Sequence, residues 1–108
     1  MTIDFRLQLK ETGQDTLVRE RLKQISSTVV SSQVVMLSSA ESHNGAFGQV
    51  SEAKALLVST TKPVSVTLNG ADPLEVDGLL VLTGTAITSL EFSTEETTAH
   101  PVEYMLWG

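Results

Sequence analysis

The chain has 108 residues, no cysteine and a net charge of −6 at neutral pH. Its length suits one domain, residues 1–108, with a single modest core, and its 41% hydrophobic content is that of a globular chain rather than a disordered one. The lack of cysteine excludes disulfides, a thiol nucleophile and zinc or iron–sulfur sites held by cysteine. Apolar runs stop at four residues, far short of the roughly 20 that a membrane helix needs, and the acidic part of the chain should repel anionic membranes, so we expect no membrane partner.

The charge is divided unevenly along the chain. Residues 1–25 carry a net +1, and residues 26–108 carry a net −7. An acidic surface repels phosphate groups, so we expect no nucleic-acid partner. The asymmetry is either an ordinary solvated acidic surface or a sign that the basic N-terminal stretch docks on an acidic neighbour, such as another copy of the chain.

The first 25 residues contain one clear pattern and one ambiguous one. Residues 2–10 alternate between apolar and polar side chains, and this period of two predicts a half-buried strand. The apolar face consists of Ile3, Phe5, Leu7 and Leu9.

Residues 14–25 fit a short helix, because their apolar residues lie at helical spacing, but they also fit the second arm of a hairpin or a loop. We therefore expect at most one short helix, near residues 14–25.

From residue 29 onward, short strands alternate with turns. Val34–Leu37 is a β-branched apolar run that we expect to be buried on both faces. Residues 38–49 form the main loop, with a turn at Asn44–Gly45, and Asp77–Gly78 predicts the tight turn of a hairpin. The firmest strand patterns cover residues 55–59, 64–68, 74–76, 79–82, 87–92 and 102–107. This many short strands predicts an all-β, antiparallel sandwich that is jelly-roll-like.

Three groups of side chains could in principle carry chemistry. They are Glu41 with His43, the group Glu95, Glu96 and His100, and the carboxylates Asp72, Glu75 and Asp77. A His–carboxylate pair can bind a metal or move a proton, and clustered carboxylates can bind calcium. Each group is also explained as a surface loop or a solvated strand edge, and no nucleophile–base set or phosphate loop accompanies it. We expect no catalytic residues, no metal, no cofactor and no enzymatic activity.

The last strand is apolar on both faces. Val102, Tyr104 and Leu106 share one face, and Glu103, Met105 and Trp107 share the other. Such a strand is either central in the sheet stack or buried at an interface, where Trp and Tyr are enriched. Both readings stay open. The candidate contact residues are Phe5, Tyr104, Met105 and Trp107, with Arg19, Arg21 and Lys23 for electrostatic docking.

Five stretches stand out in the second half of the chain: Ala55–Ser59, Lys62–Gly70, Leu79–Gly84, Ile87–Leu90 and Val102–Gly108. Together they resemble a class of small all-β virion proteins of tailed bacteriophages. The resemblance covers residues 50–108 and brings no catalytic residues with it. It implies a structural protein of the virion, either a capsid decoration (cement) protein or a piece of the tail or neck. The partners that it implies are other copies of the chain, such as a trimer, and the major capsid protein.

A different class of function is also compatible with the composition. A carbohydrate- or receptor-binding β-sandwich needs exposed aromatic residues beside Asn, Asp or Gln. The residues available for such a site are Trp107 and those of the loop 41–49.

Overall fold

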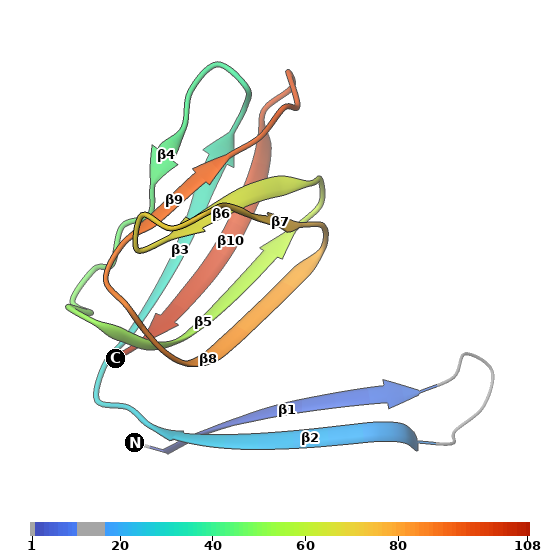
Figure 1. Cartoon of the computed structure of the whole chain (residues 1–108), viewed down its shortest axis with the longest axis vertical. Coiled ribbons are helices and arrows are strands. Elements are labelled where there is room, and N and C mark those ends of the chain that lie inside the picture. The colour runs from blue at the N-terminus through green and yellow to red at the C-terminus, as the bar shows by residue number, and fades with distance from the viewer. Residues whose placement is uncertain (1, 11–16) are drawn as a thin grey trace.

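A computed structural model of the chain describes the backbone of residues 2–10 and 17–108, and the side chains of residues 2, 4, 6 and 24–108 (Figure 1). These residues form strands and loops, and none of them is helical. The strands are β1 (Thr2–Lys10), β2 (Leu17–Ser26), β3 (Val30–Leu37), β4 (His43–Asn44), β5 (Ala53–Thr60), β6 (Val64–Leu68), β7 (Leu74–Val76), β8 (Leu79–Ile87), β9 (Leu90–Ser93) and β10 (His100–Trp107). Within this described part, no helix could cross a membrane.

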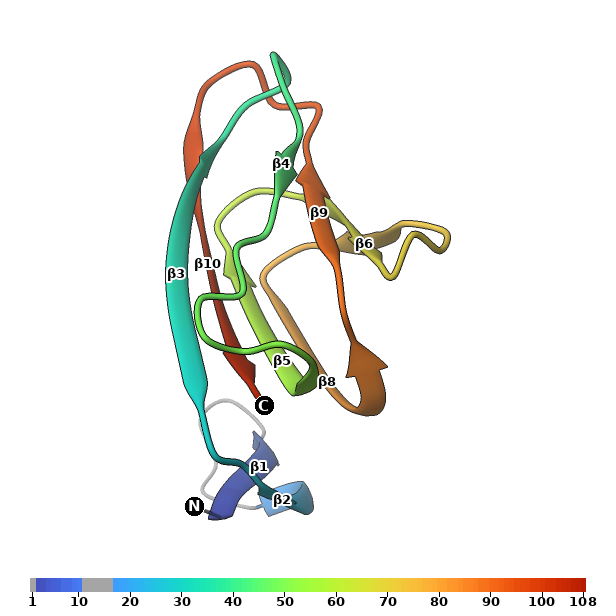
Figure 2. The ribbon, with the colours of Figure 1, turned by 90° about the vertical axis from the view of Figure 1, so that its left-hand side faces the viewer.

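Two antiparallel four-stranded sheets make up the body of the molecule. The first sheet has the strand order β3-β10-β5-β8, and the second has the order β4-β9-β6-β7. Figure 2 shows the two sheets from the side, as two layers that face each other. The prediction of an all-β antiparallel sandwich is confirmed.

The strands pair symmetrically about the β6–β7 connection. β6 pairs with β7, β5 with β8, β4 with β9 and β3 with β10. The body is therefore one long antiparallel ribbon of paired strands, folded so that successive pairs lie in alternate sheets.

The core lies between the two sheets. It contains buried aliphatic residues from both layers, together with Phe92 and Tyr104, whose ring centroids are 5.0 Å apart. The aliphatic members are Leu37, Val50, Ala53, Leu56, Val58, Val64, Val66, Val76, Ile87, Leu90, Val102 and Leu106. Strand alternation places them inward and their polar neighbours outward. With so few aromatic residues in the chain, branched aliphatic side chains fill most of this core.

The β1–β2 hairpin stands outside the sandwich. Its strands pair antiparallel with each other, from Thr2 opposite Ser26 to Lys10 opposite Leu17. In Figures 1 and 2 the hairpin lies below the ends of the sheets. A helix in residues 14–25 is therefore wrong from Leu17 onward, and residues 14–16 lie outside the described part. Pairing with β1 gives β2 its backbone hydrogen bonds, and this overrides a weak helical spacing.

The strand β3 is exposed on one face. Val34 and Met36 are 63% and 56% exposed, whereas Leu37 is fully buried. The expectation that Val34–Leu37 is buried on both faces is therefore wrong. The reason is architectural, because the first sheet has the second sheet on one side and solvent on the other.

Two turn predictions were also wrong. Asp77–Gly78 does not close a hairpin, because β7 and β8 belong to different sheets. Gly78, at φ 100°, lies where the chain crosses from the second sheet to the first. It exchanges hydrogen bonds with Thr60, whose amide donates to the Gly78 carbonyl at 2.8 Å.

The second turn was predicted at Asn44–Gly45. Asn44 ends β4 in extended backbone, and Gly45 lies so close to Leu90 that a Cβ atom there would be 2.9 Å from the Leu90 Cβ. The sequence shows that a glycine is present. It does not show whether that glycine lies in a turn, in a crossing between two sheets or at a close approach between two segments.

Candidate interaction surface

The last strand, β10, is central in the first sheet, between β3 and β5. Val102, Tyr104 and Leu106 point into the main core, and Glu103, Met105 and Trp107 lie on the opposite side. The predicted division of this strand into two faces is confirmed. The two faces have different surroundings, so the contact residues proposed on β10 divide accordingly.

Tyr104 is buried inside its own subunit. Its side chain is 1% exposed, its ring packs on Phe92, and its hydroxyl donates a hydrogen bond of 2.9 Å to the carbonyl of Ala46. Burial raises the pKa of the Tyr104 phenol above its usual value of 10.0. Tyr104 is therefore not a contact residue, because the even-numbered face of β10 is turned toward the second sheet.

Trp107 is covered by the hairpin of its own chain. Ile25, at the base of β2, forms a second buried cluster with Ala55 and Trp107, which is 9% exposed. Leu57 and Met105 border this cluster and remain half-buried. Of the predicted β10 contact residues, Met105 is thus the one that still reaches the surface.

The other predicted contact residues lie together on the hairpin. In the β1–β2 register, Phe5 is opposite Lys23, Leu7 is opposite Arg21 and Leu9 is opposite Arg19. Residues opposite each other in an antiparallel pair share a face. The same register places Ile3 opposite Ile25, so one face of the hairpin carries an apolar strand beside a cationic one.

A larger apolar surface lies on the outer face of the first sheet, and the sequence patterns did not reveal it. Exposed apolar residues on β3 and β8 flank Met105 and Leu57 in the middle. The exposed ones are Val30 (45%), Val34 (63%), Met36 (56%), Leu79 (60%) and Val81 (45%). Glu103 is the charged residue in the middle of this surface, and Lys54 of β5 lies at its hairpin end. We call this surface the outer face.

The strand registers show that the outer face is continuous. They align three rows across β3, β10, β5 and β8: Val34, Glu103, Ser59 and Leu79; Ser32, Met105, Leu57 and Val81; and Val30, Trp107, Ala55 and Thr83. A shallow hollow of about 210 Å³ lies over the first two rows. Ile25 covers part of the third row, and the first two rows continue outward from that contact.

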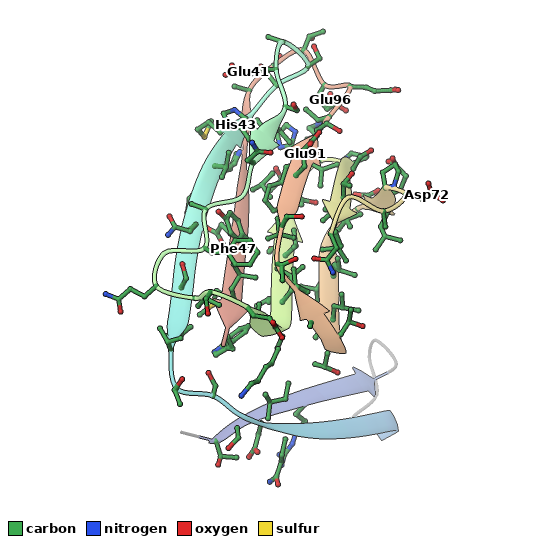
Figure 3. The ribbon with its side chains drawn as sticks, turned by 60° about the vertical axis from the view of Figure 1, so that its left-hand side comes forward. Glu41, His43, Phe47, Asp72, Glu91 and Glu96 are labelled. Carbon is green, nitrogen blue, oxygen red and sulfur yellow. The ribbon has the colours of Figure 1, made fainter. Side chains whose placement is uncertain are left out.

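The titratable groups that the sequence singled out lie apart from this surface. Nε2 of His43 is 3.5 Å from Oε1 of Glu41, and both side chains reach solvent near the top of the second sheet (Figure 3). Asp72 lies at the tip of a separate turn, and Glu75 accepts a hydrogen bond from the Ser65 hydroxyl. Within the described part of the chain, no three such groups are placed to hold a metal ion.

His100 is not a loop residue, as its polar neighbours suggested. It begins β10, opposite Leu37, and is 6% exposed. Its Nε2 lies 3.5 Å from the Thr94 hydroxyl, and its Nδ1 has no hydrogen-bond partner among the described residues. The ring is a buried part of the sandwich rather than a surface ligand.

The chain was compared with known proteins at three levels. No family model matches it. No curated protein and no solved structure matches it either. The case for a function therefore depends on the surfaces described above.

Proposed function

We propose that this chain is a non-enzymatic structural protein of a phage virion, and specifically a capsid decoration protein that stabilises the particle through contacts between subunits. The observation that carries the proposal is the outer face. A surface with this many exposed apolar side chains is typical of protein–protein contact, since isolated soluble domains seldom present a large one. A tail or neck component would use the same surface for contacts at a different position in the particle.

The strand pairing supports the proposal at the level of fold. We propose that the ribbon, whose pairs fold into sheets β3-β10-β5-β8 and β4-β9-β6-β7, is a jelly roll, as the sequence predicted. Jelly rolls are common in viral capsid proteins, but lectins also have them, so fold alone does not decide between these functions.

The surroundings of Trp107 favour the structural role over carbohydrate binding. A sugar site needs an aromatic ring open to solvent, whereas Trp107 packs under Ile25. The other aromatic residue considered for such a site is Phe47, in the loop of residues 41–49. It is half-buried and packs against the main core.

The test uses particles of the phage whose genome carries this coding sequence. One preparation comes from the intact genome, and the other from a genome in which the coding sequence is deleted. Mass spectrometry of purified particles should detect the chain, and cryo-EM should show density at regular lattice positions that the deletion removes. Purified chain added to deletion particles should restore that density. If particles made from the intact genome contain no chain, the proposal is refuted.

A further inference from the structure

We propose that the outer face is the docking site for the β1–β2 hairpin of a second copy of this chain. The inference specifies the partner and the contact for the structural role proposed above. It joins two surfaces: the outer face, which is largely apolar with one carboxylate in its middle, and a hairpin face that by register has apolar residues along one strand and cationic residues along the other.

The first argument is continuity with a contact that already exists. Ile25 of the hairpin is buried against Ala55 and Trp107, which form one end of the outer face. By register, Ile3, Phe5, Leu7 and Leu9 share the hairpin face of Ile25. The hairpin face therefore already fits this sheet surface at one position within the subunit.

The second argument is that a chain does not cover the rest of the outer face with its own hairpin. The segment leaving the hairpin is held at Gly108: the Thr28 amide and the Ser27 hydroxyl donate to the Gly108 carbonyl at 2.9 and 2.8 Å, and the Gly108 amide donates to Val29 at 2.9 Å. Folding the hairpin up over β10 would break these bonds.

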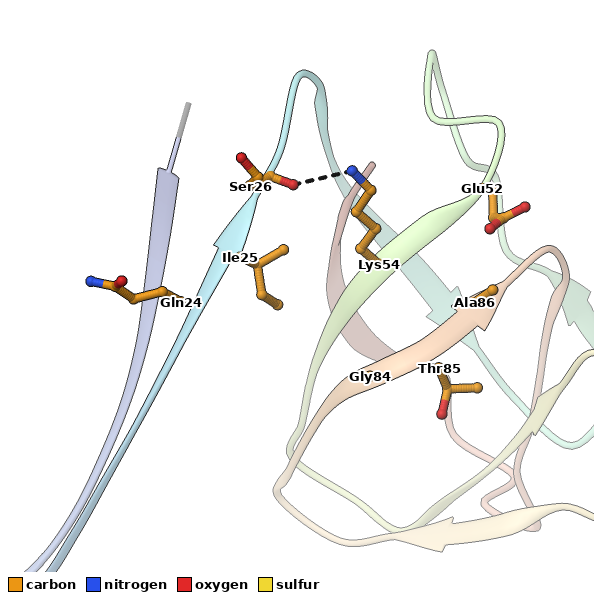
Figure 4. A pocket seen from close by; sticks show the side chains of 8 residues that line it. All are labelled: Gln24, Ile25, Ser26, Glu52, Lys54, Gly84, Thr85 and Ala86. Atoms are coloured by element: carbon orange, nitrogen blue, oxygen red, sulfur yellow. Dashed lines mark hydrogen bonds between the residues drawn. The ribbon is translucent and has the colours of Figure 1, made fainter.

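Contacts at the hairpin base agree with this fixed direction. Lys54 on β5 donates to the Ser26 carbonyl at 3.2 Å, and a groove of about 360 Å³ separates the base from Gly84 and Ala86 on β8 (Figure 4). In Figure 1 the strands β1 and β2 extend beyond the edge of the body.

The third argument is the hairpin's own need for a partner. A two-stranded hairpin is marginally stable in water unless a face packs on something. Within the described residues, β1 and β2 pair only with each other. Nine residues of β1 extend about 30 Å, whereas the axes of the outermost strands of a four-stranded sheet lie about 15 Å apart. One hairpin is therefore long enough to cross the whole outer face.

The fourth argument is complementarity of charge. The hairpin places Arg19, Arg21 and Lys23 beside its apolar strand, and the outer face offers Glu103 among apolar residues. The remainder of the chain, residues 26–108, carries a net −7. Opposite charge steers the hairpin of one copy toward the body of another and fixes its orientation. A contact of this kind joins different surfaces of the two copies, so it gives a reciprocal pair, a ring or, where the rotation does not close, an open filament.

The experiment uses two full-length double variants that should each disable one side of the contact. The donor variant carries Phe5→Asp and Leu7→Asp; these carboxylates lie opposite Lys23 and Arg21, so the hairpin itself stays paired. The acceptor variant carries Val34→Lys and Val81→Lys, at exposed positions outside the core. Sedimentation velocity should show each variant associating about 100-fold more weakly than the unmodified chain.

Mixing the two variants gives the decisive result. The donor variant retains an intact outer face, and the acceptor variant retains an intact hairpin. An equimolar mixture should therefore form a 1:1 heterodimer, while each variant alone stays monomeric. The control is Leu74→Lys, which also places a lysine at an exposed apolar position (44%) but on the second sheet, and it should associate like the unmodified chain. Raising the salt from about 0.05 M to about 0.5 M should weaken association.

Three outcomes would overturn the inference. One is a donor variant that associates as tightly as the unmodified chain, since the outer faces would then pack on each other. Another is a mixture that gives no heterodimer, and the third is an unmodified chain that stays monomeric at every concentration reached. None of these results decides whether the chain occurs in particles, so the proposed function is judged separately.

Discussion

Tyr104 shows how one side chain connects the two layers. It lies on β10 of the first sheet, stacks against Phe92 of the second, and bonds through its hydroxyl to Ala46 in the loop between β4 and β5. It is the single tyrosine of the chain. Its ionisation can therefore be followed directly by the absorbance of the phenolate.

We predict that the chain loses stability as the pH rises above about 10 because of Tyr104. Burial raises the phenol's pKa in the folded state, so the unfolded chain releases this proton first. The contribution is fully present below the unfolded pKa and is lost as the pH rises through the folded one. Urea unfolding and phenolate absorbance between about pH 9 and about pH 11 measure the two effects.

The control is Tyr104→Phe, which should lack this alkaline loss. At neutral pH it should lower the free energy of unfolding by about 1 kcal/mol, because the Ala46 carbonyl loses its donor. Equal alkaline losses in the two proteins would show that Tyr104 is not the responsible group.

His100 gives a second prediction at this scale. Its buried Nδ1 has no partner among the described residues, so an apolar residue of similar volume should be tolerated. We expect His100→Leu to change the free energy of unfolding by less than about 1 kcal/mol or to increase it. His100→Ala should lower it by about 2 kcal/mol, because it leaves a cavity. A loss with leucine as large as that with alanine in chemical denaturation would contradict this.

Among the elements, the turn after β6 joins the two sheets through hydrogen bonds. Asn69, at the end of β6 in the second sheet, has φ 53° and hydrogen-bonds the connection between β8 and β9. Its Oδ1 accepts from the amide of Thr88 at 2.7 Å, and its Nδ2 donates to the carbonyl of Ala86 at 2.8 Å. Because β8 lies in the first sheet, this one side chain links the two layers.

We predict that Asn69→Ala lowers the free energy of unfolding by about 2 to 3 kcal/mol, through lost hydrogen bonds and a strained positive φ. Asn69→Gly keeps the backbone unstrained and should be less harmful by about 1 kcal/mol. Asn69→Asp keeps the acceptor but loses the donor to Ala86, so it should also be milder than alanine. Chemical denaturation of the three variants measures these differences, and equal losses would exclude a role for the side-chain bonds.

The strands show where local patterns succeed and where they do not. Residues 64–68 and 102–107 were predicted well, because each has one face in the core and alternation reports this directly. Residues 17–25 lacked a clean period, since their partner is β1 rather than the core. Their strand conformation depends on a pairing that the segment itself does not encode.

On the scale of the whole molecule, the sandwich has a core of its own. Among the residues whose side chains the structure describes, the main core takes none from β1 or β2, and the second cluster takes Ile25 from the hairpin. The described hydrophobic contacts of the body are therefore made without the hairpin, apart from those of Ile25 over Trp107.

We predict that a chain beginning at Ser26 still folds, with the free energy of unfolding lowered by about 1 to 3 kcal/mol because Ile25 no longer buries Trp107. Emission of Trp107, the single tryptophan, should shift to longer wavelength. A thermal melt followed by near-UV circular dichroism measures the stability. A shortened chain without a cooperative transition would show that the hairpin belongs to the folding unit.

The sequence by itself determined the class of fold and the two faces of the last strand. Both follow from the period of two, which expresses the burial of one side of a strand regardless of its neighbours. Charge and composition also separated a basic N-terminal stretch from an acidic remainder.

Only the tertiary structure decided which surfaces are open to a partner. Tyr104 and Val34 are both apolar positions in predicted strands, yet one lies in the core and the other is 63% exposed. The difference depends on the presence of the second sheet on one side of the first, and on the hairpin that covers Trp107 but not Met105. These are long-range contacts between segments far apart in the chain, and no local pattern contains them.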